Sequence, residues 1–208
     1  QSMGRRRLLA KASLVSNAKP EQEINAESSQ RGNCTAISTP RCKPSSSKRQ
    51  SSGENVMSID QAYNFHAIDE AVSTSGLLSE EQLAQLRTSG YDAVINLLPH
   101  DSQYAIKNEE SIVIAQGVDY LYIPVDFAAP AEQDYAAFVK AMRSCQGKTK
   151  VLIHCAANYR VSAFYSIYAY EYLGWPASRA WQHIESIWNP LENPPWDQFI
   201  ARYIPSDG

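Results

Sequence analysis

The chain has 208 residues and a net charge of −3, a length that suits one domain with a substantial core and is short for two. The charge is unevenly placed. Residues 1–55 hold ten Lys and Arg against four Asp and Glu, whereas residues 56–208 hold nine against eighteen. Binding to a phosphate backbone needs a basic face, so the acidic body argues against nucleic acid as a partner. No apolar run approaches the roughly 20 residues of a membrane span.

Residues 1–55 are expected to be a disordered, low-complexity basic tail. They are rich in Ser, Gln, Asn, Lys and Arg and hold few large apolar residues, so they cannot bury enough surface to offset chain ordering. The folded domain is expected over residues 56–208. Four scattered cysteines favour free thiols over a disulfide framework, and we expect a cytoplasmic protein. An organelle-targeting role for the Arg- and Ser-rich opening stays open.

From residue 61 onward the chain alternates between apolar runs and segments with helical periodicity. In chain order the expected elements are extended segments over 61–68 and 70–76, a helix from Ser79 to Gly90, a strand over 91–99, a helix over 108–116, a strand over 118–125, a helix over 130–146, a strand over 150–155 and a long apolar helix-like segment over 163–174. The first helix opens with the capping box Ser79-Glu80-Glu81-Gln82. The strands are recognised by continuous apolar runs.

This alternation predicts an α/β fold: a single domain with a mostly parallel central sheet flanked by helices. In such sheets the binding crevice lies at the carboxyl ends of the strands. Three predicted strands end in residues that can carry chemistry, namely Cys155, Asp126 and the pair His100-Asp101. We therefore expect these residues to converge.

The stretch HCAANYRVS, residues 154–162, joins a buried strand to a helix and is called the nucleophile loop below. Such a loop presents backbone N–H groups and the positive end of a helix dipole to an anion. That field favours the thiolate of Cys155. Arg160 adds a planar fork that can grip two oxygens of a phosphate or sulfate. Ser162 could donate a hydrogen bond to the thiolate, which favours its departure as a leaving group.

Taken singly, a cysteine at a strand end is often a small core residue and an arginine near a helix start is often a surface charge. The combination of strand, His-Cys, loop, Arg and hydroxyl favours a nucleophile site. The segment resembles the active-site loop of the cysteine-dependent phosphatases, whose pattern is His-Cys-x5-Arg-Ser/Thr. Residues 71–99 and 117–125 resemble the bacterial dual-specificity-phosphatase-like family linked to the beta-lactamase-hydrolase-like proteins, and the likeness covers roughly residues 56–205.

The resemblance implies a cysteine-phosphatase-like fold and hydrolysis of phosphomonoesters through a phosphocysteine, without metal or other cofactor. Carried over, Cys155 would be the nucleophile, Arg160 the phosphate clamp and Ser162 the assisting hydroxyl. His154 would fix the loop through its ring hydrogen bonds. The remaining phosphate-binding positions of the loop are Ala156, Ala157, Asn158, Tyr159 and Val161. The expected partner is a phosphorylated protein or small molecule, and inorganic phosphate or sulfate could occupy the loop.

The loop departs from the phosphatase pattern in its spacing. Cys155 to Arg160 is Cys-x4-Arg, and Val161 stands where an ungapped match would place the arginine. One position on a helix start is a rotation of about 100°. The glycine usual in phosphatase loops is replaced by Asn158, which tolerates a left-handed turn. A shorter loop is also typical of rhodanese-like sulfurtransferases, so sulfur transfer is the alternative reaction, and a phosphate-binding pseudoenzyme is the alternative without catalysis.

Phosphoryl transfer needs a proton for the departing oxygen. Asp126, which follows the strand over 118–125, is the first candidate for this general acid; Asp134 is second and Asp101 third. Four tyrosines on the apolar helix are expected to be packed: Tyr165, Tyr168, Tyr170 and Tyr172. The histidines at 66, 100 and 183 lack the spacing of a metal site.

Overall fold

The computed structural model describes residues 57–205. The predicted tail over residues 1–55 lies outside the described residues. Of the helices between residues 57 and 205, none combines the length and apolar character that crossing a bilayer requires.

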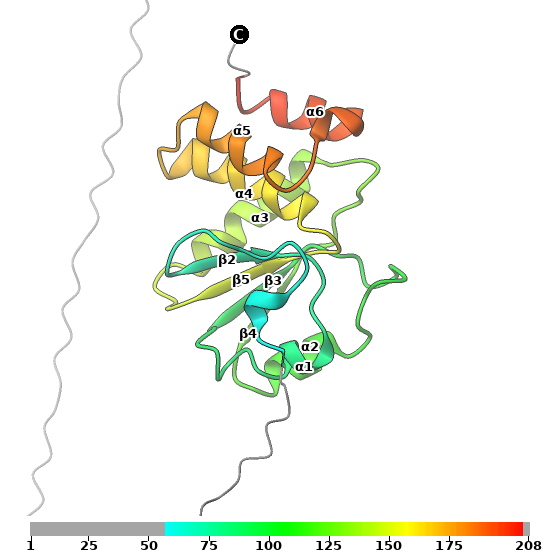
Figure 1. The fold of residues 1–208 in the computed structure, drawn as a ribbon, viewed down its shortest axis with the longest axis vertical. Coiled ribbons are helices and arrows are strands. Elements are labelled where there is room, and N and C mark those ends of the chain that lie inside the picture. Colours follow the sequence, from blue (N-terminus) through cyan, green and yellow to red (C-terminus); the bar gives the residue numbers. More distant parts are fainter. Residues whose placement is uncertain (1–56, 206–208) are drawn as a thin grey trace, which may run out of the picture. The chain divides into compact units, whose positions relative to one another are not determined.

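A five-stranded sheet forms the centre of the molecule (Figure 1). Its strands are β1 (His66–Ala67), β2 (Val72–Ser75), β3 (Ala93–Asn96), β4 (Asp119–Tyr122) and β5 (Val151–His154). The spatial order is β1-β2-β5-β3-β4, with every neighbouring pair parallel except the antiparallel pair β1–β2. The predicted α/β fold with a mostly parallel sheet is confirmed.

The register of the sheet brings the ends of four strands into line. Ser75 pairs with His154, His154 with Asn96, and Asn96 with Tyr122. The segments that follow these residues therefore leave the sheet side by side, at the carboxyl edge where a binding crevice was expected.

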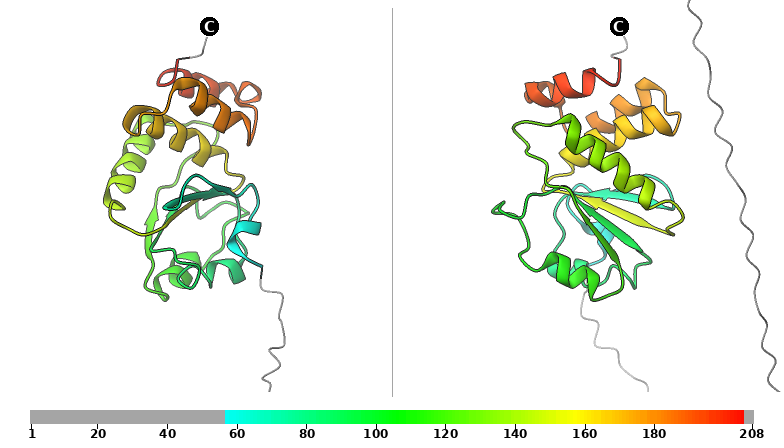
Figure 2. Two further views of the ribbon diagram at one scale, coloured as in Figure 1. Left: turned by 60° about the vertical axis from the view of Figure 1, so that its left-hand side comes forward. Right: turned by 180° about the vertical axis from the view of Figure 1, so that it is seen from behind.

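Helices cover both faces of the sheet, and each face has its own core (Figures 1 and 2). On one face lie α1 (Glu80–Leu83) and α2 (Glu109–Ile114). On the other lie α3 (Glu132–Ser144), α4 (Tyr159–Tyr172), α5 (Ala177–Glu185) and α6 (Pro194–Ala201). Two 3₁₀ helices, η1 (Ile59–Gln61) and η2 (Pro190–Glu192), complete the elements. The larger core lies under α3 to α6 and is rich in aromatic rings, with Trp196 fully buried.

The predicted capping box is present. The Ser79 side chain accepts from the N–H of Gln82, and the Gln82 side chain accepts from the N–H of Ser79. The α-helix it starts is only one turn long, however, because residues 84–90 continue as turns.

Other element boundaries also differ from the sequence prediction. The strand expected over 91–99 is paired only over Ala93–Asn96, although Leu97 and Leu98 are buried beyond its end. Apolar runs mark burial, and burial continues past the last paired residue, as does one backbone bond, from the N–H of Leu97 to the carbonyl of His154 at 2.9 Å. The expected packing of the tyrosines is confirmed for Tyr165 and Tyr168, which are buried, and for Tyr170, which packs half-buried against the larger core. It is wrong for Tyr172, which is 49% exposed at the end of α4.

Candidate active site

The nucleophile loop connects β5 to α4 at the carboxyl edge of the sheet. His154 is the last residue of β5, and α4 begins at Tyr159. Cys155 is fully buried at the base of the loop, and its N–H donates to the carbonyl of Ser75 at 3.3 Å. Asn158 has φ 66°, the left-handed conformation that an Asn in place of the usual glycine tolerates.

The loop presents backbone donors in addition to the side chain of Arg160. The N–H groups of Ala156, Ala157, Tyr159 and Arg160 donate to no acceptor among residues 57–205. The last two are at the N-terminus of the 14-residue helix α4. Free N–H groups together with the positive end of a helix dipole favour an anion at this point.

Arg160 lies at the mouth of the loop. Its Nε donates to the carbonyl of Val125 at 2.9 Å, and its guanidinium lies over the Phe127 ring, 5.1 Å from the centroid. Val161, which occupies the arginine position of an ungapped phosphatase match, is fully buried in the core. The one-residue shift therefore directs the cation toward the loop after β4 while the apolar neighbour fills the core.

Ser162 is buried one turn into α4. Its hydroxyl donates to the carbonyl of Tyr159 at 3.0 Å and accepts from the indole N–H of Trp188 at 3.1 Å. The Trp188 ring also stacks on Tyr159, with centroids 4.8 Å apart. The single hydroxyl proton of Ser162 is thus engaged with the helix backbone in this structure, and assisting Cys155 would require the hydroxyl to rotate.

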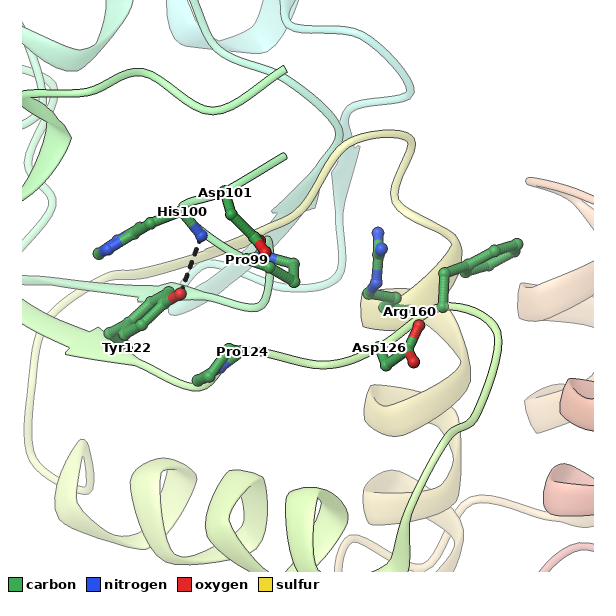
Figure 3. Close-up of a pocket in the computed structure, with 8 residues that line it drawn as sticks. Pro99, His100, Asp101, Tyr122, Pro124, Asp126 and Arg160 are labelled. Atoms are coloured by element: carbon green, nitrogen blue, oxygen red, sulfur yellow. Dashed lines mark hydrogen bonds between the residues drawn. The ribbon is translucent and has the colours of Figure 1, made fainter. Parts of the chain in front are cut away.

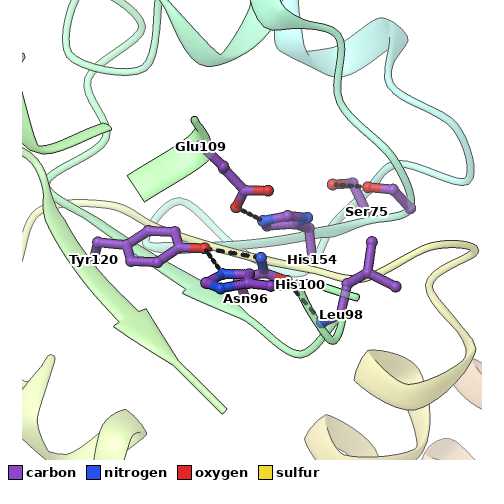
Figure 4. A network of polar contacts seen from close by, with 8 residues as sticks. Ser75, Asn96, Leu98, His100, Glu109, Tyr120 and His154 are labelled. Atoms are coloured by element: carbon purple, nitrogen blue, oxygen red, sulfur yellow. Dashed lines mark hydrogen bonds and ion pairs between the residues drawn. The ribbon is translucent and has the colours of Figure 1, made fainter. Parts of the chain in front are cut away.

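His154 lies beneath the loop in a buried polar network (Figure 4). Its Nε2 lies 2.7 Å from Oε1 of Glu109, the first residue of α2, and both side chains are less than 5% exposed. The ring therefore contacts α2, whereas the resemblance led us to expect contacts that fix the loop. Burial acts to raise the pKa of Glu109, but the charge and hydrogen bond of His154 outweigh it and hold that pKa below its ordinary value.

The network reaches from His154 toward the protein surface. Asn96 donates to the hydroxyl of Tyr120 at 2.9 Å, and the His100 ring lies 3.3 Å from the same hydroxyl. Burial and the nearby Glu109 raise the pKa of Tyr120. Sequence reasoning missed Glu109, because an acidic residue in the first turn of a helix is expected from the helix dipole alone.

A cavity of about 730 Å³ opens beside Arg160 (Figure 3). Two of the three general-acid candidates, Asp126 and Asp101, line it together with the stacked rings of His100 and Tyr122. Asp134 is at the start of α3 and does not line it. Burial raises the pKa of Asp134, and the charge of Asp126 adds to this effect.

A second cavity, of about 230 Å³, lies over the nucleophile loop itself. Its lining residues are Ala156, Ala157, Arg160, Leu98, Ser102, Tyr104, Phe127 and Tyr159. Arg160 and Phe127 line both cavities, so the two meet there. The expected convergence is present for Asp126, His100 and Asp101, which line the larger cavity at the carboxyl edge of the sheet, whereas Cys155 is fully buried and lines neither cavity. Their roles in a reaction stay predictions.

Within residues 57–205, no group of three or more His, Cys, Asp and Glu side chains is arranged to hold a metal ion.

The arrangement of sheet, loop and helices is shared with the solved structures of TpbA, Tk-PTP and the Siw14 catalytic core. No family model matches the sequence. A crystal structure of a DUF442 phosphatase candidate from Shewanella putrefaciens CN-32 is 36% identical, with a TM-score of 0.63, and the alignment covers 69% of this chain and 95% of that one. The chain belongs to the DUF442 family, so the resemblance drawn from the sequence is confirmed.

Two further comparisons are more distant. The beta-lactamase hydrolase-like protein of Xylella fastidiosa is 27% identical over 103 residues, which are 48% of this chain and 23% of that protein. The chain thus spans about a quarter of the length of the curated relatives it matches. Pseudomonas aeruginosa TpbA, solved in complex with phosphotyrosine as a cysteine-to-serine variant, shares the fold with 14% identity, a TM-score of 0.54 and coverage of 66% and 82% of the two chains.

Proposed function

We propose that the protein hydrolyses phosphomonoesters through a phosphocysteine intermediate on Cys155. The observation that carries this proposal is the nucleophile loop: a cysteine at the base of a strand-to-helix turn whose unpaired N–H groups and neighbouring arginine suit a bound phosphoryl group. Membership of the DUF442 family supports it.

The reaction has two steps, formation of the phosphocysteine and its hydrolysis. The Cys155 thiolate attacks phosphorus, so that the S–P bond forms as the bond to the departing oxygen breaks, and Asp126 gives that oxygen a proton. Asp126 then removes a proton from water, the water oxygen attacks phosphorus, and the S–P bond breaks to regenerate the thiolate and release phosphate. Arg160 and the loop N–H groups bind the phosphoryl oxygens throughout.

Phosphotyrosine-type substrates fit the mouth of the loop best. Three aromatic side chains line the smaller cavity, namely Tyr104, Phe127 and Tyr159. Flat rings at this position favour an aryl group attached to the phosphate. The phosphotyrosine complex of TpbA gives a precedent for such a ligand on this fold.

The test is the initial rate of para-nitrophenyl phosphate hydrolysis between pH 5 and 8, with Cys155→Ser alongside. We expect phosphate release by the wild type and none above background for the variant. The matched control is Cys145→Ser, which changes a second buried cysteine outside the loop and is expected to retain activity.

A parallel assay supplies thiosulfate and cyanide, because the four-residue spacing between Cys155 and Arg160 is also typical of rhodanese-like loops. Thiocyanate formation without phosphate release would replace the proposal with sulfur transfer. Inactivity in both assays would contradict catalysis and leave a phosphate-binding protein.

A further inference from the structure

A segment that precedes β1 lies against the nucleophile loop. The Asn64 side chain donates from Nδ2 to the carbonyl of Ala157 at 3.0 Å. In return, Nδ2 of Asn158 donates to the carbonyl of Asn64 at 2.7 Å. Two residues 94 positions apart thus each hold the backbone of the other's segment.

Both asparagines adopt positive φ, at 46° for Asn64 and 66° for Asn158. This region of backbone space is unfavourable for most side chains, and Asn is among the few residues that enter it. Asn158 is further held by its bond to Oγ1 of Thr74 at 3.1 Å, and it is fully buried. The turn that starts α4 is therefore held by side-chain bonds where a glycine would adopt it freely.

The contacts also fix how two peptide groups of the loop are turned. The carbonyl of Ala156 accepts from the N–H of Leu77 at 3.0 Å, and that of Ala157 accepts from Asn64. In a trans peptide the C=O and the following N–H point in opposite directions. With the Ala156 carbonyl held against residue 77, the N–H of Ala157 is turned to the other side. The turn at Asn158 then sets where α4 begins.

The backbone next to the contact between the Asn64 segment and the nucleophile loop is too closely packed to admit a further side chain. A Cβ added to Gly76 would lie 2.9 Å from the carbonyl oxygens of Ala156 and Tyr63. The N–H of Gly76 donates to the same Tyr63 carbonyl at 2.6 Å. The segment around residue 64, the connection after β2 and the nucleophile loop therefore form one close-packed backbone unit.

We propose that Asn64 is a positioning residue of the nucleophile loop, which keeps the turn at Asn158 in the conformation that presents the loop N–H groups to an anion. Its effect on turnover rests on the proposed phosphatase function, whereas its effect on anion binding does not.

Asn64→Gly tests this inference, because glycine tolerates the positive φ and adds no charge but removes the donor to Ala157. Asn193→Gly is the matched control: Asn193 makes no side-chain cap bond at the start of α6, where glycine is tolerated. Affinity for inorganic phosphate is measured by calorimetry, well below the unfolding temperature of each variant, together with kcat and KM for para-nitrophenyl phosphate.

We expect Asn64→Gly to weaken phosphate binding by about tenfold, the worth of roughly one hydrogen bond, and to lower kcat more than it changes KM. The control is expected to match the wild type. A role in stability alone would lower the unfolding temperature and leave phosphate affinity unchanged, which would overturn the inference, as would a wild type that binds no phosphate. A wild type that binds phosphate without turning over substrate would contradict the proposed function only. The phosphate affinity of Asn64→Gly would then still decide whether Asn64 positions the loop.

Discussion

Arg160 shows how a single position in a loop changes what a side chain can reach. With four residues between it and Cys155, its Nε is bonded to Val125 and its guanidinium lies over Phe127. The side chain is thus tied to the loop that carries Asp126 while it also lines the cavity over Ala156 and Ala157. A cation held there can contact an anion in the loop and at the same time hold the segment that carries Asp126, the proposed general acid.

Arg160→Lys tests whether the geometry of the guanidinium matters beyond its positive charge. Lysine keeps the charge but lacks the planar fork and the Nε donor. We expect kcat/KM for para-nitrophenyl phosphate to fall by roughly 10²-fold, the usual effect of removing a donor to developing negative charge. Steady-state kinetics against Lys140→Arg, an exposed exchange of the same two residue types on α3, provide the measurement. Unchanged kinetics would show that a point charge is sufficient at this position.

For single residues, the sequence alone identified the site residues that lie close together in the chain. The cysteine and the arginine follow from the spacing and residue types of one nine-residue stretch, in which Asn158 is recognised as a residue that tolerates positive φ. Asn64 and Trp188 could not be found that way. Their contacts with the loop, to Ala157 and Ser162, exist only because the sheet order and the packing of the α5–η2 segment bring distant segments together.

Among the elements, α2 and β5 are joined by the buried pair of Glu109 and His154. This buried pair stabilises the fold only while both side chains are present. Because the pKa of Glu109 is below its ordinary value of 4.5, the contribution of the pair to stability is present above about pH 4.5 and is lost as the pH falls through the lower folded value.

Removing one partner should therefore destabilise the protein. We expect Glu109→Ala to lower the free energy of unfolding by about 1–3 kcal/mol at pH 7, since it leaves the buried Nε2 of His154 without its hydrogen-bond partner. Glu110→Ala, at the next and exposed position of the same helix, should change it by less than about 0.5 kcal/mol. Urea denaturation measures both. Equal effects at the two positions would contradict a structural role for the pair.

The order and type of the elements were predictable, whereas their ends were not. Alternating apolar runs and helical periodicity report which face of an element is buried, and this decides strand or helix. They do not report where an element ends: the strand expected over 118–125 spans only Asp119–Tyr122, although the N–H groups of Ile123 and Val125 still donate to the carbonyls of Asn96 and Leu97. The pair of Glu109 with His154 depends on how α2 packs against the sheet, which a single element's pattern does not contain.

At the scale of the whole molecule, the two faces of the sheet carry different kinds of side chain. The face under α1 and α2 carries the polar network below the nucleophile loop, and the face under α3 to α6 carries the aromatic core. At the rim of the aromatic core, His183 on α5 lies against His66 on β1, with ring centroids 5.8 Å apart. Its Nε2 is buried and has no hydrogen-bond partner among residues 57–205.

This histidine should make the stability of the fold sensitive to mild acid. Burial lowers the pKa of His183 to about 4, and the charges of His66 and Arg179 act in the same direction. The unfolded chain binds this proton near pH 6.5. Between these values the unfolded state holds more protons, so the stabilisation is complete above about pH 6.5 and is lost as the pH falls toward 4. The shift corresponds to about 3 kcal/mol.

His183→Phe removes the titrating group and keeps a ring among Tyr165, Trp175 and His66. We expect the free energy of unfolding of the variant to fall by about 3 kcal/mol less than that of the wild type between pH 7 and pH 4. Urea titrations at half-unit pH steps measure the free energy of unfolding of both proteins. Because both contain the pair of Glu109 and His154, its contribution cancels when one pH curve is subtracted from the other. If the two pH curves run parallel, His183 titrates alike in the folded and unfolded chains, and the packing of α5 on β1 does not depend on its neutral form.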